Sequence, residues 1–100
     1  EVEGQRVVVH KKHVTNILDC ESETLTAVMT LVQQIANHLV DDCGYEGVNL
    51  LNANGASAGQ SVPHFHIHMI PRRTGDGINA WPKFPVATRS LSEMAAFLKL

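Results

Sequence analysis

Apolar and polar positions follow two different periods along this chain, and the changes of period divide it into short strands and helices. Residues 7–9 are a β-branched run, Val-Val-Val, which is typical of a buried strand. From residue 23 to residue 43 the apolar positions follow a helical repeat, which predicts one long helix. Ser22 is placed to cap the first turn of that helix, and Gly44 is placed to end it.

The second half of the chain predicts two further strands and a short helix. Residues 47–51 and 62–70 are expected to be antiparallel neighbours joined by a glycine-bearing loop. Residues 71–85, with three prolines and two glycines, are expected to be irregular. A capping box at residues 90–93 opens a helix that runs through Phe97. This order predicts an α+β fold: an antiparallel sheet with one long helix and a short C-terminal helix.

Three histidines stand at alternate positions in the last predicted strand. They are His64, His66 and His68. Side chains alternate between the two faces of a strand, so the three imidazoles share one face while Phe65 and Ile67 pack inward. A core has no use for three polar rings that each need a hydrogen-bond partner when buried. The histidine face is therefore expected to be an active site.

Composition adds limits on what the chain does. One hundred residues are expected to form a single domain, residues 1–100. Eight basic against ten acidic residues give a net charge of -2, which argues against a nucleic-acid or membrane partner, because both favour a basic excess. No apolar stretch approaches the ~20 residues of a membrane span. Cys20 and Cys43 lie at opposite ends of the predicted long helix, too far apart for a disulfide, which indicates free thiols and a cytoplasmic location.

The histidines fit more than one kind of chemistry. His64 with His66, or His66 with His68, can share a metal ion, but a further ligand must come from elsewhere. No acidic residue occurs between Glu46 and Asp76 to supply it. Alternatively, one neutral imidazole attacks an acyl or phosphoryl centre as a nucleophile, without a metal. A purely structural polar face would favour lysine, threonine and glutamate over three histidines.

The loop before the histidines has the composition of an anion-binding loop. Gly59, Gln60 and Ser61 offer backbone amides, a side-chain amide and a hydroxyl, which are donors that phosphate oxygens accept. Gly55 and Gly59 allow close approach of the backbone to a ligand. A nucleophile beside such a loop predicts nucleotidyl or phosphoryl transfer with no metal required.

The string at residues 54–72 closely resembles the signature of the histidine-triad (HIT) family. That signature is H-x-H-x-H followed by two apolar residues, after a glycine-rich G-Q-S/T-V loop. Residues 7–13 are similar to the strand and lysine-x-histidine that precede the family's long helix. The resemblance covers residues 4–81, roughly, and residues 72–77 resemble the bacterial or archaeal hydrolase branch.

The resemblance implies a nucleotide hydrolase or transferase. It implies that His66 attacks the α-phosphorus and holds a covalent nucleotidyl intermediate, while a backbone carbonyl near His64 orients its ring. It implies that His68 hydrogen-bonds the phosphate or the departing group, and that Gln60 and Ser61 contact the phosphate and leaving group. Water then releases the nucleoside monophosphate. The implied substrates are nucleoside phosphoramidates, nucleotidyl esters or dinucleoside polyphosphates, with a purine base.

Departures from the family pattern concern the base pocket and a zinc site. Relatives usually carry a further N-terminal segment that lines the base pocket, and this chain is expected to lack it. A family asparagine that binds ribose or phosphate falls at Ala53, so Asn52 and Asn54 are expected to substitute for it. Many relatives hold a structural zinc with upstream cysteines and histidines matching His13 and His64. No cofactor is expected for catalysis, and zinc is expected only if such cysteines exist.

The resemblance also implies a homodimer, because relatives pair through the long helix and a sheet edge. Residues 47–52 are expected to form that edge. Two alternatives to the hydrolase stay open. One is a nucleotide-binding module with little catalysis, and the other is a metal-dependent hydrolase that uses the H-x-H pair.

Overall fold

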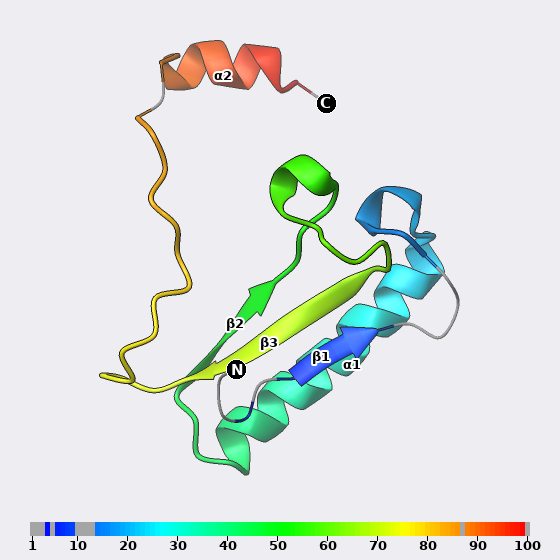
Figure 1. Cartoon of the computed structure of the whole chain (residues 1–100), viewed down its shortest axis with the longest axis vertical. Coiled ribbons are helices and arrows are strands. Elements are labelled where there is room, and N and C mark those ends of the chain that lie inside the picture. Colours follow the sequence, from blue (N-terminus) through cyan, green and yellow to red (C-terminus); the bar gives the residue numbers. More distant parts are fainter. Residues whose placement is uncertain (1–3, 5, 10–13, 87, 100) are drawn as a thin grey trace.

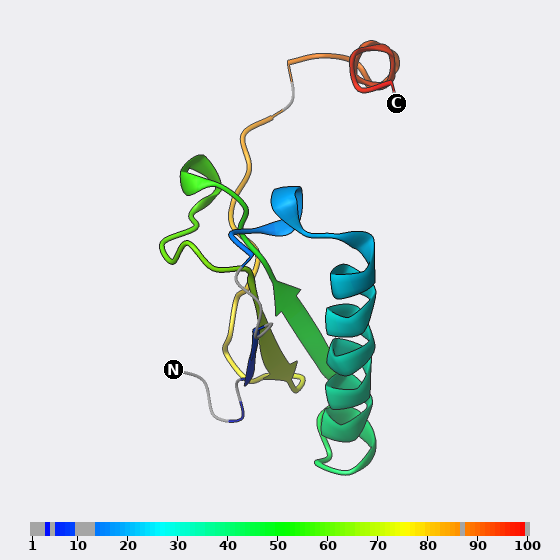
Figure 2. The ribbon, with the colours of Figure 1, turned by 90° about the vertical axis from the view of Figure 1, so that its right-hand side faces the viewer.

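The described part of the chain forms a three-stranded antiparallel sheet with one long helix packed on one of its faces (Figure 1, Figure 2). This computed structural model describes residues 4, 6–9, 14–86 and 88–99. Strand β1 spans Arg6–Val9, β2 spans Gly47–Leu51 and β3 spans His66–Arg72, in the spatial order β1-β3-β2. The predicted α+β fold is confirmed.

The central strand β3 begins at His66, four residues later than the sequence predicted. The reason lies in the turn before it, where Pro63 has no N–H to give to a neighbouring strand and the His64 N–H bonds back to the Val62 carbonyl at 2.8 Å. Pairing then starts at once, with Val9 of β1 opposite His66. His64 therefore precedes the strand instead of belonging to it.

At its other end β3 continues through Pro71 to Arg72, two residues into the segment predicted to be irregular. Proline is usually excluded from central strands because it lacks an N–H for the ladder. Here the pairing with β1 ends at Met69, so β3 is paired on one side only at Pro71 among the described residues. The missing N–H therefore leaves no ladder bond unmade on the β1 side.

The long helix α1 spans Ser22–Asp41. Ser22 is its first residue and not its cap, because the Glu21 carbonyl already accepts the Leu25 N–H at 2.9 Å and Glu21 takes the cap position without a side-chain bond. The helix ends two residues before the predicted end, since the next two N–H groups both bond to the His38 carbonyl.

The core lies between α1 and the sheet (Figure 2). Side chains from both elements are at most 5% exposed there: Val28, Val32 and Leu39 from the helix, and Phe65, Ile67 and Met69 from the β3 segment. Burial of such a side chain stabilises the fold by roughly 1.5–3 kcal/mol. The inward packing predicted for Phe65 and Ile67 is confirmed. Because side chains alternate, His66 and His68 lie on the sheet face away from α1.

The C-terminal helix α2 spans Leu91–Phe97 and stands off the sheet at the end of an extended segment (Figure 1). Its predicted cap is confirmed, since the Ser90 hydroxyl accepts the Glu93 N–H at 3.2 Å. Cys20 and Cys43 are free thiols, also as predicted. None of the helices in the described residues is long and apolar enough to cross a membrane.

Candidate active site

One hydrogen bond fixes the ring of His66. Its Nδ1 lies 2.7 Å from the backbone carbonyl oxygen of His64. A carbonyl oxygen only accepts, so in the neutral ring Nδ1 carries the proton and Nε2 keeps its lone pair. A nucleophilic imidazole needs this tautomer. The turn at residues 62–64 is what places the carbonyl there, because it takes His64 out of the ladder.

All three histidines line one hollow, called here the triad hollow. Its volume is about 640 Å³, and its lining residues are Val9, Ser61, Val62, His64, His66 and His68. The rings of His66 and His68 meet edge to face, with centroids 5.0 Å apart and planes at 82°. The three imidazoles thus converge as the sequence predicted, although His64 arrives from the turn before the strand.

A second hollow, the loop hollow, shares Ser61, His66 and His68 with the first. Its volume is about 590 Å³, and it lies against the glycine-bearing loop and the extended C-terminal segment. The lining from these two segments includes Asn52, Ala53, Gly59, Gln60, Pro82 and Phe84. Ser61, which is exposed, is therefore the loop residue that reaches both hollows.

The loop itself is held by bonds within its own backbone. A 3-10 helix, η2, spans Ala56–Ala58, and Gly59 follows in the left-handed conformation with φ 93°. The Gly59 N–H donates to Ala56 at 3.0 Å and the Gln60 N–H donates to Gly55 at 3.2 Å. These two amides, which the sequence offered as phosphate donors, are therefore engaged inside the loop. A Cβ on Gly59 would meet no atom within 4 Å, so its outer side is open to a ligand.

Asn52 and Asn54 form a hydrogen-bonded chain that ends on the backbone of His66. Asn52 Nδ2 donates to the His66 carbonyl at 2.9 Å, and Asn54 Nδ2 donates to Asn52 Oδ1. Asn54 Oδ1 in turn accepts the Ile17 N–H at 2.8 Å. Asn52 lines the loop hollow, whereas Asn54 lines neither hollow. Substrate contacts by both residues stay predictions, and the observed bonds tie both to the protein.

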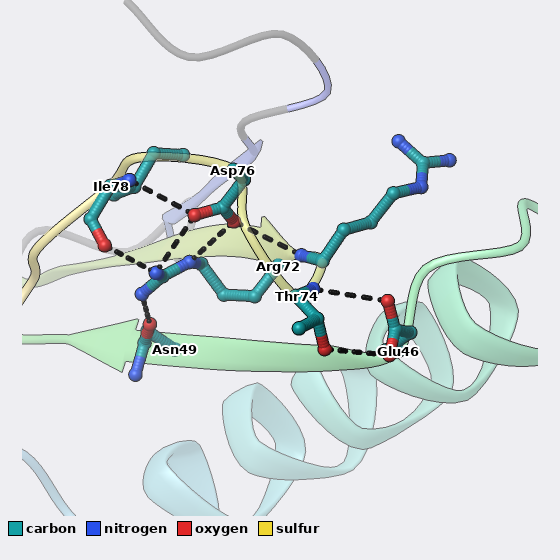
Figure 3. Close-up of polar contacts among 7 residues, drawn as sticks. Glu46, Asn49, Arg72, Thr74, Asp76 and Ile78 are labelled. Carbon is teal, nitrogen blue, oxygen red and sulfur yellow. Dashed lines mark hydrogen bonds and ion pairs between the residues drawn. The ribbon is translucent and has the colours of Figure 1, made fainter.

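A second polar cluster lies at the far end of β3 (Figure 3). The guanidinium of Arg72 makes a two-point ion pair with Asp76, Nε to Oδ2 at 2.9 Å and Nη2 to Oδ1 at 3.1 Å. Its Nη1 donates to Asn49 Oδ1 at 2.6 Å, and Nη2 also donates to the Ile78 carbonyl. Arg72 first, and then the N–H groups of Ile78 and Arg73, hold the pKa of the Asp76 carboxyl well below its usual range.

A metal ion needs three or more ligand side chains that converge on one point. Among the described residues, no group of three or more His, Cys, Asp or Glu side chains could hold one. His13, predicted to share a zinc with His64, lies outside the described residues. The zinc site stays a prediction.

Several residues that line the two hollows or hold the glycine-bearing loop were not predicted from the sequence. Val9 enters the triad hollow because the register sets it opposite His66, and register depends on strand pairing that the sequence pattern does not fix. Pro82 and Phe84 come from a segment predicted only to be irregular. Asn16, which lies before α1, bonds to Gln60 from 44 residues away. A polar cluster with helix-capping character at residues 15–19 was the one available signal.

A comparison with protein families decides what this arrangement belongs to. The model of the HIT domain matches residues 1–75. The chain belongs to the HIT family. Among its HIT relatives, Protein hit of Bacillus subtilis (strain 168) is 40% identical over 78 residues, which cover 77% of this chain and 54% of that protein. A crystal structure of a HIT family protein from Bacillus anthracis superposes with a TM-score of 0.75 at 34% identity, covering 96% of this chain and 71% of that one.

Two further HIT relatives carry names that state an activity. The adenosine 5'-monophosphoramidase hnt1 of Schizosaccharomyces pombe is 28% identical over 94 residues, 91% of this chain and 67% of that protein. The bis(5'-adenosyl)-triphosphatase of Dictyostelium discoideum is 32% identical over 73 residues, 73% of this chain and 49% of that protein. The chain spans about half the length of the first curated relatives that it matches.

Proposed function

We propose that this protein hydrolyses nucleotides at the α-phosphate through a covalent nucleotidyl-His66 intermediate. The observation that carries the proposal is the bond from His66 Nδ1 to the His64 carbonyl, because it leaves the Nε2 lone pair of a neutral ring at the edge of two hollows. The relatives named as a phosphoramidase and a dinucleoside triphosphatase support the reaction class.

The first step transfers the nucleotidyl group to His66. Its Nε2 lone pair forms a bond to the α-phosphorus, and the bond from phosphorus to the leaving group breaks with its electron pair on the leaving group. His68, whose ring lies 5.0 Å from that of His66 between centroids, hydrogen-bonds the phosphate or the departing group. The Ser61 hydroxyl is placed to donate to a phosphate oxygen from either hollow.

The second step releases the product. A water oxygen attacks phosphorus and gives up a proton to solvent, which replaces any proton that the leaving group took up in the first step, while the phosphorus–nitrogen bond breaks and returns the lone pair to His66 Nε2. The product is a nucleoside monophosphate, and the enzyme is restored. No atom of a metal enters either step, and the second step needs only water as co-reactant.

The substrates that fit this scheme are phosphoramidates of a purine nucleoside, nucleotidyl esters and dinucleoside polyphosphates. Each offers an α-phosphorus with a leaving group on one side and a nucleoside on the other. The triad and loop hollows meet at Ser61, His66 and His68, so a phosphate held there has space on two sides for these two parts.

The protein is further proposed to be a homodimer that pairs through α1 and the β2 edge. Leu50 and Leu51 of this edge strand are 46% and 37% exposed. A groove of about 680 Å³ lies between α1 and Leu50, and its lining is mostly apolar: Leu25, Met29, Val32, Ala36 and Leu50, with Thr26, Thr30 and Gln33. Light scattering after gel filtration is expected to give the mass of two chains, and a monomer at micromolar concentration would contradict the pairing.

The decisive variant is His66→Ala, assayed for release of AMP from adenosine 5'-phosphoramidate. Loss of the nucleophile is expected to lower kcat by a factor on the order of 10³ or more. The matched control is His38→Ala, since His38 is exposed on α1, bonds Asp42 at 2.7 Å and lines neither hollow. Its kcat is expected to stay at the wild-type value.

Three other outcomes would overturn the proposal. Retained turnover in His66→Ala excludes that residue as the nucleophile. Binding of AMP without any turnover in the wild type favours a nucleotide-binding module. Loss of activity on treatment with a chelator, restored by a divalent metal, favours a metal-dependent enzyme built on the H-x-H pair.

A further inference from the structure

The side chain of Gln60 makes four hydrogen bonds within the protein. Its Nε2 donates to the carbonyls of Thr15 at 2.7 Å and Val62 at 2.9 Å. Its Oε1 accepts the Gly55 N–H at 2.8 Å and Asn16 Nδ2 at 3.1 Å. A primary amide has two N–H donors and two acceptor lone pairs, so these four bonds use every polar site of the side chain.

A contact between the Gln60 amide and a phosphate, as predicted from the sequence, would require one of these bonds to break. Its backbone N–H is engaged as well, on the Gly55 carbonyl at 3.2 Å. Gln60 does line the loop hollow, but its polar atoms are directed to protein partners. Replacing a made hydrogen bond by one to phosphate brings no net gain in bonds, whereas the exposed Ser61 beside it makes a new one.

The bonds of Gln60 lead to the carbonyl that orients the nucleophile. The Val62 carbonyl accepts both from Gln60 Nε2 and from the His64 N–H at 2.8 Å. The carbonyl of His64 in turn accepts from His66 Nδ1 at 2.7 Å. Gln60 is thus connected to His64 through the shared Val62 carbonyl. The carbonyl oxygen of His64 is the atom that sets the tautomer of the His66 ring.

Two of the four bonds, one from Nε2 and one to Oε1, tie the amide to a part of the chain that is remote in sequence. Thr15 and Asn16 lie 45 and 44 residues before Gln60. Asn16 is itself held, because its Oδ1 accepts the Leu18 N–H and its own N–H donates to Asp19. The amide therefore joins three segments: the one before α1, the start of the glycine loop and the turn into β3.

From these bonds we infer that Gln60 is a positioning residue, which orients His66 through Val62 and His64, and is not a substrate ligand. This inference rests on the proposed function for its effect on rate, but its effect on the His66 ring stands without it. Of the loop residues predicted to contact phosphate, Ser61 is then the side chain that binds substrate.

The test is a double-mutant cycle between Gln60 and Asn16, with adenosine 5'-phosphoramidate as substrate and AMP as the binding probe. Gln60→Ala removes all four bonds. Asn16→Ser removes only the donor to Gln60 Oε1 and keeps an oxygen to cap the Leu18 N–H. Asn16 lines neither hollow, so a direct effect on substrate is excluded by its place.

Positioning predicts a split between kcat and binding. Gln60→Ala is expected to lower kcat about tenfold, the equivalent of roughly one lost hydrogen bond, with KM and the Kd of AMP changed by less than about twofold. Asn16→Ser is expected to lower kcat less, and the double variant is expected to be no slower than Gln60→Ala alone. A tenfold rise in KM and Kd at unchanged kcat, or effects that add fully, would show a substrate ligand and overturn the inference.

If the wild type has no turnover, the proposed function is wrong, but the positioning role of Gln60 can still be tested by a second measurement. In protein labelled with ¹⁵N-histidine, Gln60→Ala is expected to turn a single Nδ1–H tautomer of His66 into a mixture of both. An unchanged tautomer overturns the positioning role. If Gln60→Ala fails to fold, Asn16→Ser decides: a shift of the His66 tautomer supports the inference, and an unchanged tautomer contradicts it.

Discussion

Strand β3 carries a dense polar cluster at each of its two ends, and the two clusters differ in what they leave open. At the Arg72 end, the guanidinium nitrogens bond to Asp76, Asn49 and a carbonyl, so the cluster closes on itself (Figure 3). At the His66 end, hydrogen bonds fix Nδ1 and the backbone carbonyl but leave Nε2 without a hydrogen bond among the described residues.

A structural polar cluster and a chemically reactive one differ in whether their hydrogen bonds leave a reactive atom available. Both ends are rich in hydrogen bonds, and the Arg72 end also holds the Asp76 carboxyl, whose pKa lies well below its usual range. Density of polar contacts marks a place that is rigid. A reactive atom that those contacts orient but do not occupy, at a hollow, marks a place that does chemistry. Variants at the His66 end should therefore change rate, and variants at the Arg72 end should change stability.

Beyond His66 itself, the largest effect on rate is expected for His68→Ala. Removal of this imidazole takes away the group proposed to hydrogen-bond the phosphate or the leaving group, so kcat is expected to fall about 10²-fold, less than for His66→Ala. The free energy of unfolding, measured in urea, should change little because the ring is at a hollow and not in the core. A lower free energy of unfolding at unchanged kcat would show that His68 supports the fold and takes no part in the reaction.

Asn52 and Asn49 each make a hydrogen bond at one of the two ends of β3, so they form a matched pair of test positions. Asn52→Ala removes the bond to the His66 carbonyl and should lower kcat/KM by up to about tenfold, as expected for one hydrogen bond of ~1 kcal/mol. Asn49→Ala removes the bond to Arg72 and should leave kcat/KM unchanged while lowering Tm. Equal losses of rate in the two variants would erase the distinction between the two ends of β3.

The two ends also differ in how well they could be predicted. Local patterns were sufficient where the cause is local: the alternation around Phe65 placed the histidines on the outer face, and the Ser90 box placed α2. They failed where distant segments decide. The bend at Pro63 and the register with β1 set the start of β3, and the partners of Gln60 lie up to 45 residues away.

The Arg72 end was beyond sequence reasoning for the same reason. Arg72 and Asp76 are close in sequence, but Asn49 joins them from β2, 23 residues earlier. Nothing in the amino-acid pattern distinguishes this closed ion pair from an open basic site. The family signature supplied the role proposed for His66 and the expectation that a backbone carbonyl near His64 orients its ring. The structure shows that this carbonyl is the one of His64 itself.

Asp76→Asn, like Asn49→Ala, is expected to leave the rate unchanged and to act on stability alone. The Arg72 pair lowers the folded-state pKa of the Asp76 carboxyl, so its stabilisation is full above the unfolded pKa of about 3.9 and is lost as pH falls toward the folded value. The free energy of unfolding of the wild type and of Asp76→Asn is measured in urea from pH 7 down to pH 2. The difference between the two proteins should be constant down to pH ~4 and should narrow below it. A difference in free energy of unfolding that does not depend on pH would mean that the ion pair does not stabilise the fold.

The chemistry proposed for this site depends on the ring tautomer of His66, which can be measured. Long-range ¹H–¹⁵N correlation spectra of ¹⁵N-histidine protein at pH ~8, above the ordinary histidine pKa of about 6.5, report which nitrogen holds the proton. The His66 signals are assigned by their absence in His66→Ala. The structure predicts one tautomer, with the proton on Nδ1 and a bare Nε2. A proton on Nε2, or an even mixture of the two forms, would contradict it.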